Sequence, residues 1–397
     1  MADLRRAPLD GSSLVILLSA MAAMNALSVE IILPAIVPIS RDLLVSESAA
    51  AMLIGGYFMA YGVGQMLWGL LSDAFGRRAM LLLGMTGFLF ASIGAAMATD
   101  FTTLMVFRVA QGVLGASPVI ANAIVRDISS GQQAARTQSV LSAVISIAPL
   151  MAPAVGSGLL VMFSWRIIFL FLALVSAALI VTAYVRLPET LAEKQLSRLH
   201  PGFIARRTKE LFSNQQFRTG ALVMSLTFSG FASLLTMGSV VLENAYDIPP
   251  EAFGSVYMIV AAATLLGVLL ARAMLKTQTL LVVGKRALMV LSVAVLLHVC
   301  LLFTTPGFPL FWSIIFIYLF AFGMVFPTFT SYGLEAAGNS KGFAASLIGA
   351  MNMTGGFLTS LLVTALYDGS FRAISYSMIF FGAAAILIFA ADRLKRG

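Results

Sequence analysis

Long apolar runs alternate with short polar segments along the chain. Most runs reach about 20 residues, the length of α-helix that crosses the hydrocarbon core of a bilayer. Only Asp100 clearly separates the third run from the fourth, which indicates a tight helical hairpin rather than one merged helix. The pattern predicts an all-α integral membrane protein with twelve membrane-spanning helices, at residues 13–39, 48–71, 79–99, 101–125, 137–162, 166–187, 217–242, 252–275, 287–305, 309–334, 343–367 and 371–391.

The longest hydrophilic segment separates the sixth predicted helix from the seventh. It divides the chain into an N-terminal six-helix bundle (1–187), a linker (188–216) and a C-terminal six-helix bundle (217–397). In the linker, apolar pairs such as Leu211-Phe212 flank basic residues. Part of the linker is therefore either an amphipathic helix on the membrane surface or a plain charged connection.

The two halves carry similar features at similar places. Pro118 and Pro327 precede a charged residue by the same interval in the fourth and tenth runs. The segment Gly76-Arg77-Arg78, after the second run, has a counterpart in Gly284-Lys285-Arg286, after the eighth. Together with the division into six plus six, these matches indicate a duplicated transporter with a site between its halves.

Composition supports a membrane protein with many spans. Hydrophobic residues make up 60% of the chain and charged residues 11%, against about 45–50% and 25% in an average soluble domain. The net charge of +8 reports topology, because nearly all basic residues fall on one side of the predicted spans. The opposite side holds only Arg41, Arg166 and Arg372. The positive-inside rule then places both termini in the cytoplasm, and no nucleic-acid partner is expected.

Residues that would support enzyme or metal chemistry are sparse. The chain has one cysteine, Cys300, and two histidines that lie far apart, His200 and His298. Gly284-Lys285 lacks the glycine framework and the following serine or threonine of a P-loop. We therefore expect no metal, no cofactor and no enzymatic activity.

An acidic residue, Glu30, lies inside the first apolar run. A charge near the middle of a span costs roughly 2.5–3.5 kcal/mol on insertion scales, and such residues are functional sites by default. The alternative is an acid at a helix end that reaches water. Pro34 and Pro38 follow, and each removes a backbone donor and favours a kink.

The segment Gly69-Leu70-Leu71-Ser72-Asp73-Ala74-Phe75-Gly76-Arg77-Arg78 resembles the signature loop of the major facilitator superfamily. Ala74 stands where the family often has a basic residue, so one ion-pair partner is missing. Gly76 allows a tight turn, and Asp73 can pair with Arg77 or Arg78 or face the positive end of a helix. We predict a latch of Gly69, Asp73, Gly76, Arg77 and Arg78 that joins the halves when the protein opens outward. The alternative is a basic loop that only sets topology.

In the fourth run, Arg108 and Gln111 share one helix face with Asn122. The segment Arg108-Val109-Ala110-Gln111-Gly112 resembles the second signature of the family. Arg108 lies roughly 10 Å and Glu30 about 13 Å from the outer ends of their spans, by helical rise. A Glu30–Arg108 pair, direct or through water, is therefore predicted, and proton uptake by Glu30 would release Arg108. The alternative is a static pair that only fixes packing.

The fifth run contains Pro149, Pro153 and Gly156 among small residues. It resembles the third signature of the family, which marks antiporters, and suits a hinge or seal between the halves. The double proline, together with the segment Glu30-Ile31-Ile32-Leu33-Pro34, resembles the Bcr/CflA drug-resistance branch. There an acid precedes a Leu-Pro pair in the first span.

The resemblance implies the major facilitator fold, with two pseudo-symmetric six-helix bundles around a central cavity lined by spans one, four, seven and ten. The stripe of serines and threonines in span seven is also typical of helix packing, as aromatic stripes are. The candidates for the substrate cavity are Met24, Asn25, Tyr57, Gln111, Asn122, Ser233, Thr236, Phe322, Phe326 and Phe329.

These features predict a monomeric, proton-coupled transporter of a bacterial inner membrane. It would export small, partly lipophilic compounds by alternating access, with membrane lipids around it and the proton as coupling ion. Glu30 and Arg108 would form the proton-coupling site. The alternatives are a carrier for one native metabolite and a transporter-like sensor or structural membrane protein.

Overall fold

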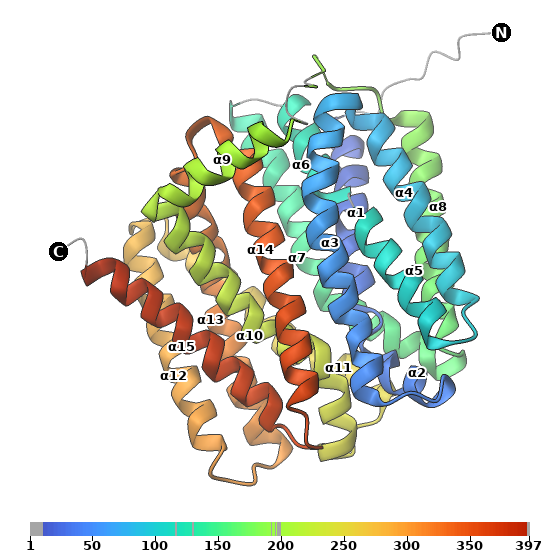
Figure 1. The fold of residues 1–397 in the computed structure, drawn as a ribbon, viewed down its shortest axis with the longest axis vertical. Coiled ribbons are helices and arrows are strands. Elements are labelled where there is room, and N and C mark those ends of the chain that lie inside the picture. The colour runs from blue at the N-terminus through green and yellow to red at the C-terminus, as the bar shows by residue number, and fades with distance from the viewer. Residues whose placement is uncertain are drawn as a thin grey trace.

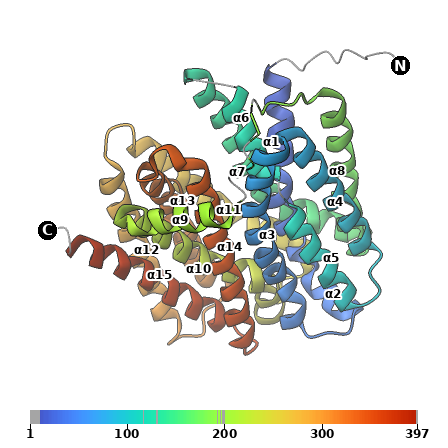
Figure 2. The same cartoon turned by 45° about the horizontal axis from the view of Figure 1, so that its top comes forward.

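The computed structural model is built of helices, and it describes residues 11–115, 117–128, 131–191, 193–194, 196 and 200–394. The start of the predicted N-terminal bundle and parts of the linker therefore lie outside the described residues. Two groups of helices stand side by side, the first half of the chain in one and the second half in the other (Figures 1 and 2). We call these groups the N-half and the C-half.

The N-half begins with α1 and ends with α8, and its helices pack mainly on one another. Its elements are α1 (Gly11–Glu30), η1 (Leu33–Ala35), α2 (Ile36–Asp42), α3 (Glu47–Phe75), α4 (Arg77–Ala96), α5 (Phe101–Leu114), α6 (Ser117–Ile128), α7 (Gly131–Met162) and α8 (Arg166–Arg186).

The C-half follows the linker helix α9 (Pro201–Ser213). Its elements are α10 (Gln215–Tyr246), α11 (Pro250–Met274), α12 (Leu280–Leu301), α13 (Phe308–Glu335), η3 (Gly338–Ser340), α14 (Lys341–Ala365) and α15 (Arg372–Leu394).

The twelve predicted spans correspond to apolar helical segments of this structure. Among the described residues, eleven segments are long and apolar enough to cross a membrane. The remaining predicted span, the fifth (137–162), falls on α7, whose apolar part is the shorter stretch Ile147–Met162. Asp100 separates α4 from α5 as predicted, because its carboxylate accepts the Thr103 amide at 2.9 Å and caps α5. These bonds from Thr103 hold the pKa of Asp100 below its ordinary value.

Two predicted spans are broken rather than continuous. The first span stops at Glu30, and Pro34 stands in the first turn of η1, in line with the predicted kink. The fourth span divides into α5 and α6 after Gly115, and Pro118 is the second residue of α6. Proline is tolerated in the first turn of a helix, where its missing N–H would have no intrahelical partner, so Pro118 is compatible with a helix that begins at Ser117.

The repeat between the halves is weaker than the sequence suggested. Helix α12 begins at Leu280, seven residues before the predicted start at 287. Gly284-Lys285-Arg286 therefore lies inside α12, whereas Gly76 separates α3 from α4 and Arg77-Arg78 begin α4. A Cβ on Gly284 would lie 3.2 Å from Phe329 Cζ, so this glycine serves close packing of α12 on α13. Pro327 lies inside the continuous helix α13.

The linker, residues 188–216, contains a helix, α9. Of the two interpretations of the linker, this agrees with the one that placed a helix there. It lies across the C-half helices near the end at which α3 turns into α4 (Figures 1 and 2). That end also carries Arg77, Arg78 and Arg126, and we call it the basic face. The other end, with α2 and the α10–α11 connection, is the opposite face.

The halves meet along two helix pairs, α3 with α14 and α7 with α11. Small residues allow the close approach. A Cβ on Gly55 of α3 would lie 2.7 Å from Ser360 Cβ of α14, and one on Gly62 would lie 3.1 Å from Met353 Cβ. These contacts set the position of every residue that lies between the halves.

Candidate functional site

Glu30 is the last residue of α1, at the point where the first span breaks. Its side chain is buried, with 6% of the residue exposed. Its Oε2 atom has no hydrogen-bond partner among the described residues. A buried carboxylate with an unpaired oxygen is costly when ionised. The site can therefore hold a proton or must recruit a partner.

Arg108 is fully buried in α5. Its Nη1 donates to Ser28 Oγ at 3.2 Å and to Gln111 Oε1 at 3.0 Å. Its guanidinium carbon lies 4.5 Å from the centre of the Tyr57 ring, a cation–π contact. The Nε and Nη2 atoms have no hydrogen-bond partner in the described part of the chain. Arg108 is thus a buried cation held by neutral groups.

The predicted direct pair between Glu30 and Arg108 is not formed in this conformation. Among the described residues, no ion pair joins them, and Arg108 contacts Ser28 instead. Ser28 and Glu30 are two positions apart, about 200° around a helix. Because Ser28 faces Arg108, Glu30 points to another side of α1. The proton-coupling role of both residues remains a prediction.

Gly156 of α7, from the predicted antiporter segment, packs directly behind Glu30. A Cβ on Gly156 would lie 2.2 Å from the carbonyl oxygen of Ile31, so only glycine fits there. On the C-half side, a Cβ on Gly254 of α11 would lie 2.6 Å from Ala154 Cα and 2.8 Å from Pro153 O. The backbones of α1, α7 and α11 are therefore in contact at this level.

Ser157 joins α7 to α11 by hydrogen bonds. Its Oγ donates to Pro250 O at 2.8 Å and accepts from the Gly254 amide at 2.9 Å. The prediction placed a hinge or seal in this segment, and Pro153, Gly156 and Ser157 do lie at contacts. Pro149, one turn earlier, is partly buried within α7. The segment thus joins the halves, while its movement stays a prediction.

Polar side chains connect the halves at the opposite face. Arg41 of α2 donates to Glu243 of α10 at 2.5 Å. Asn244 of α10 donates to Glu47 of α3 at 2.5 Å and to the Tyr367 hydroxyl at 3.1 Å. The sequence analysis did not foresee these pairs, because no local pattern connects positions about 200 residues apart.

At the basic face the halves are separated by a cavity of about 730 Å³. It lies between α3 and α6 of the N-half, α14 of the C-half and residues of the linker and α9. Met66 and Leu347 line it, whereas beside them Gln65 packs against Gly349. The structure is therefore closed at the opposite face and open at the basic face.

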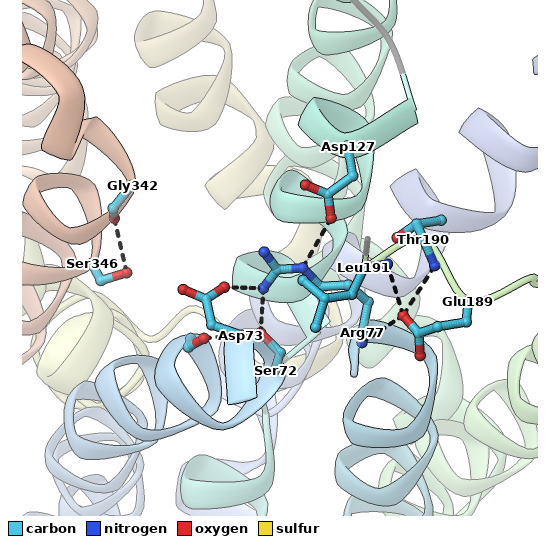
Figure 3. A network of polar contacts seen from close by, with 10 residues as sticks. Ser72, Asp73, Arg77, Asp127, Glu189, Thr190, Leu191, Gly342 and Ser346 are labelled. Carbon is cyan, nitrogen blue, oxygen red and sulfur yellow. Dashed lines mark hydrogen bonds and ion pairs between the residues drawn. The ribbon is translucent and has the colours of Figure 1, made fainter. Parts of the chain in front are cut away.

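Arg77 is the centre of a charged cluster that borders this cavity (Figure 3). It forms ion pairs with Asp73 and, at 3.0 Å, with Asp127, and its Nη1 donates to Ser72 Oγ at 2.8 Å. The predicted pairing of Asp73 with Arg77 is thus present. Arg78 instead donates to the carbonyl oxygen of Tyr184 at 2.7 Å. Among the described residues, these contacts of Arg77 and Arg78 join elements of the N-half to one another.

Glu189 is a residue that the sequence analysis missed. Its carboxylate accepts the backbone amides of Arg77 at 2.9 Å and of Arg78 at 3.2 Å (Figure 3). It therefore caps the N-terminus of α4, where an anion is favourable. Gly76 has φ +119°, a backbone conformation open to glycine, and a Cβ there would lie 2.7 Å from Glu189 Oε2. Gly69, also in the predicted latch, lines the cavity.

An aromatic cluster lies at the interface of the halves. Phe322 of α13 contacts Phe231 with ring centres 5.1 Å apart, and Phe326 with 5.8 Å. Phe228 of α10 contacts Phe58 of α3 at 5.9 Å, which links the cluster to the N-half. We call Phe58, Phe228, Phe231, Phe322 and Phe326 the aromatic cluster. Of these, the sequence analysis selected only Phe322 and Phe326.

Other predicted cavity residues have packing roles in this structure. Phe329 packs on Phe389 at 5.6 Å and beneath Gly284, within the C-half. Thr236 bonds Ser360 Oγ of α14 at 2.7 Å, and Ser233 donates to Gly230 O, both fully buried. The alternative interpretation of the span-seven stripe, helix packing, therefore describes these two residues here.

The remaining predicted residues lie in the N-half. Asn25 accepts a hydrogen bond from the Tyr57 hydroxyl at 2.6 Å, beside the break at Gly115. Met24 is buried, 3% exposed, next to Asn25. Gln111 is fully buried and donates to Ser92 Oγ at 2.7 Å, so it supports Arg108 rather than lining a cavity. Asn122 donates to Pro118 O at 2.8 Å.

Comparisons with known proteins agree with this architecture. The family model of the Major Facilitator Superfamily matches residues 18–360. The chain is 28% identical over 358 residues to Multidrug resistance protein D of Escherichia coli (strain K12), covering 88% of each chain. It is 28% identical over 248 residues to the Bicyclomycin resistance protein homolog of Haemophilus influenzae, covering 62% of each. The crystal structure of a D-xylose-proton symporter has the same fold, with TM-score 0.75 and 15% identity, covering 95% of this chain and 96% of that one.

Proposed function

Because the chain belongs to the major facilitator superfamily, and is thus an integral membrane transporter rather than an enzyme, we propose that it exports small, partly lipophilic compounds in exchange for protons. The observation that carries the proposal is the asymmetry of the two faces. The opposite face is closed by Arg41–Glu243 and by Ser157 on Gly254, while the basic face is open to a cavity. A buried acid, Glu30, lies at the contact between the halves.

The basic face is the cytoplasmic face in this proposal. Basic residues gather there, as the positive-inside rule requires of cytoplasmic segments. Both termini are then cytoplasmic, the structure is inward-facing, and the membrane is the inner membrane of a bacterium. An exporter in this state takes its substrate from the cytoplasm through the cavity beside Asp73.

The substrate class follows from the aromatic cluster and from the relatives. Rings of Phe58, Phe228 and Phe322 come from both halves and are buried against one another here, and in this proposal a substrate stacks on them when the halves move. Two similar proteins carry names of multidrug and bicyclomycin resistance. Both observations favour lipophilic compounds with ring systems over sugars, which need many hydrogen-bonding groups.

Glu30 is the proton carrier in this proposal. Its buried carboxyl is uncharged after proton uptake, which suits the environment seen here. Release of the proton leaves a buried anion, which a cationic substrate or a polar partner must stabilise. Arg108, on α5, contacts another side of α1 through Ser28. In this proposal it acts on Glu30 through its electric field rather than by a direct ion pair.

The test is efflux from proteoliposomes with an imposed pH gradient across a panel of amphiphilic drugs. Wild type should transport, and Glu30→Gln should lose gradient-driven transport while it still binds the drugs. The matched control is Glu251→Gln, which removes an exposed acid at the start of α11. Undiminished transport by Glu30→Gln would contradict its role. Failure of every drug in the panel would favour a carrier for one metabolite, and binding without transport would favour a sensor.

A further inference from the structure

Two buried polar atoms near the contact between the halves have no hydrogen-bond partner among the described residues. One is Oε2 of Glu30, in the N-half, and the other is the hydroxyl of Tyr257, in α11 of the C-half. Tyr257 is only 1% exposed. Buried polar groups are nearly always hydrogen-bonded, so each exception requires an explanation.

The elements next to these two groups pack on one another. Element η1, which follows Glu30, packs against both α7 and α11. Gly254 touches Ala154 of α7, and Tyr257 is three positions further along α11, on the same helix face. The charge of an ionised Glu30 acts electrostatically on the Tyr257 hydroxyl. The Phe253 ring stacks on the Tyr257 ring with ring centres 5.4 Å apart.

Other charged or titratable groups around Glu30 face another side of α1, are hydrogen-bonded or are distant. Helix α5 supplies Arg108, whose Nη1 is bonded to Ser28 and Gln111 and whose Nε and Nη2 have no partner among the described residues, and α3 supplies Tyr57, bonded to Asn25. Tyr61 of α3 stacks on Tyr57. Between residues 137 and 162, α7 has no ionisable side chain. The ionisable residues of the other neighbouring helices lie toward their ends: Arg126 and Asp127 on α6, Arg166, Tyr184 and Arg186 on α8, and Arg218, Glu243 and Tyr246 on α10.

We propose that Tyr257 is the hydrogen-bond partner of ionised Glu30, and that this bond holds the halves together at the opposite face until substrate binds. Tyr257 is then a positioning residue for coupled transport. This inference rests on the proposed function, because it assigns the partner of the proposed proton carrier. Protonated Glu30 has no negative charge to attract the hydroxyl, so the bond weakens and the opposite face is freer to open.

The bond would prevent uncoupled proton flow. An antiporter leaks protons when its empty, deprotonated form returns from the inward-facing to the outward-facing state. In this chain that form has an ionised Glu30, which Tyr257 would hold in the inward-facing arrangement. A substrate that competes for the Glu30 carboxylate would break the bond and permit the return. The bond therefore couples proton release to substrate export.

Distances across the opposite face test the proposal. Spin labels go on cysteines at Leu44 and Phe303, which are 91% and 83% exposed in opposite-face loops of the N-half and the C-half, with Cys300→Ser as background. Double electron–electron resonance spectroscopy in lipid nanodiscs then measures the fraction of molecules with an open opposite face at pH 5 and pH 9. The background should be more closed at pH 9. Tyr257→Phe should raise the open-to-closed ratio at pH 9 roughly 10-fold, as loss of a charge-assisted bond predicts.

Two further variants make the outcome decisive. Tyr332→Phe removes another buried, unpartnered hydroxyl of the C-half and should keep the background pH dependence. Glu30→Gln should lose that dependence. If Glu30→Gln loses it but Tyr257→Phe keeps it, the pairing is wrong while the proton site stands. If Glu30→Gln also keeps it, the proposed proton site itself is wrong. A faster substrate-free proton leak in proteoliposomes with Tyr257→Phe would support the pairing independently.

Discussion

Arg41 Nη2 and Glu243 Oε1 lie 2.5 Å apart and join α2 of the N-half to α10 of the C-half. Glu243 lies near the end of α10, and its partner belongs to the other half. The arginine side chain is 65% exposed and the glutamate side chain 15%. The pair is therefore weak in free energy, yet it lies where the two halves must separate if the opposite face opens.

Breaking this pair should shift the conformational equilibrium toward the outward-facing state. Exposed ion pairs contribute about 0–1 kcal/mol, so Arg41→Ala should raise the outward-facing fraction by up to about 5-fold. Distances between spin labels in opposite-face loops measure the shift. Arg166→Ala is the control, because Arg166 pairs with Asp42 at 2.7 Å within the N-half. An equal shift in both variants would show that the effect is not specific to the contact between halves.

Gly254 should be required for closure of the opposite face. A Cβ there would lie 2.6 Å from Ala154 Cα, and backbone cannot move aside as a flexible side chain does. Gly254→Ala should cost about 1–3 kcal/mol of the closed arrangement and reduce transport by about 10-fold or more. Gly158→Ala is the control, since nothing lies within 4 Å of a Cβ at Gly158. Transport assays and label distances should both separate the two variants.

Arg77 and Arg78 should differ sharply although they are neighbours. Arg77 is 7% exposed and serves Asp73, Asp127 and Ser72 with one guanidinium. Lysine cannot reproduce this geometry, so Arg77→Lys should lower stability by about 1–3 kcal/mol. Arg78→Lys should change it little, because Arg78 is partly exposed and bonds a single carbonyl oxygen. Thermal unfolding in detergent measures both, and equal melting temperatures would contradict the prediction.

The latch predicted at Asp73 would form in the outward-facing state, whereas this structure is open at the basic face. Asp73 and Gly342, at the start of α14, line the same cavity, and the cap residue Ser340 makes no side-chain capping bond. When the basic face closes, Asp73 can meet the positive end of α14, a contribution of about 0.3–2 kcal/mol. Asp73→Asn should therefore lower the outward-facing fraction and transport together. Glu193→Gln, an exposed acid on the same cavity, is the control. The latch would be excluded if Asp73→Asn behaved like this control.

The sequence predicted those features that local chemistry determines. Run length gave the spans, Pro34 gave the break after Glu30, and the spacing of Asp73 and Arg77 gave an ion pair. It did not show which way Glu30 points, because depth in the membrane fixes height along a helix and not the direction of a side chain. The Ser28 contact of Arg108 indicates that direction, because it places Glu30 on another side of α1 from Arg108.

Contacts between the halves could not be predicted from the sequence for a different reason. Glu243 and Tyr257 each lie more than 200 residues from the N-half partner argued for them. Such pairs depend on how α3 and α14, and α7 and α11, pack. Single positions in these helices look like ordinary apolar or rim residues. The position of Phe329 could not be predicted for the same reason. The aromatic stripe on α13 continues around the helix, so Phe329 packs on Phe389 in the interior of the C-half.

Phe322 and Phe329 provide a matched test of where substrate binds. Phe322 belongs to the aromatic cluster between the halves, whereas Phe329 packs on Phe389 inside the C-half. Leucine keeps apolar volume and removes only the ring. Because ring contacts contribute about 0.5–1.5 kcal/mol, Phe322→Leu should weaken binding of aromatic drugs by about 2- to 10-fold. Phe329→Leu should leave binding unchanged and lower the melting temperature.

Titration of purified protein with a fluorescent aromatic drug and with an aliphatic amine of similar size separates the possible results. The ring contribution predicts a loss for the aromatic drug alone, since an aliphatic amine cannot stack on Phe322. Equal losses for both compounds would mean that Phe322 shapes the cavity without contacting the drug. A loss confined to Phe329→Leu would move the binding site into the C-half, away from the contact with Phe58 and from the acid at Glu30.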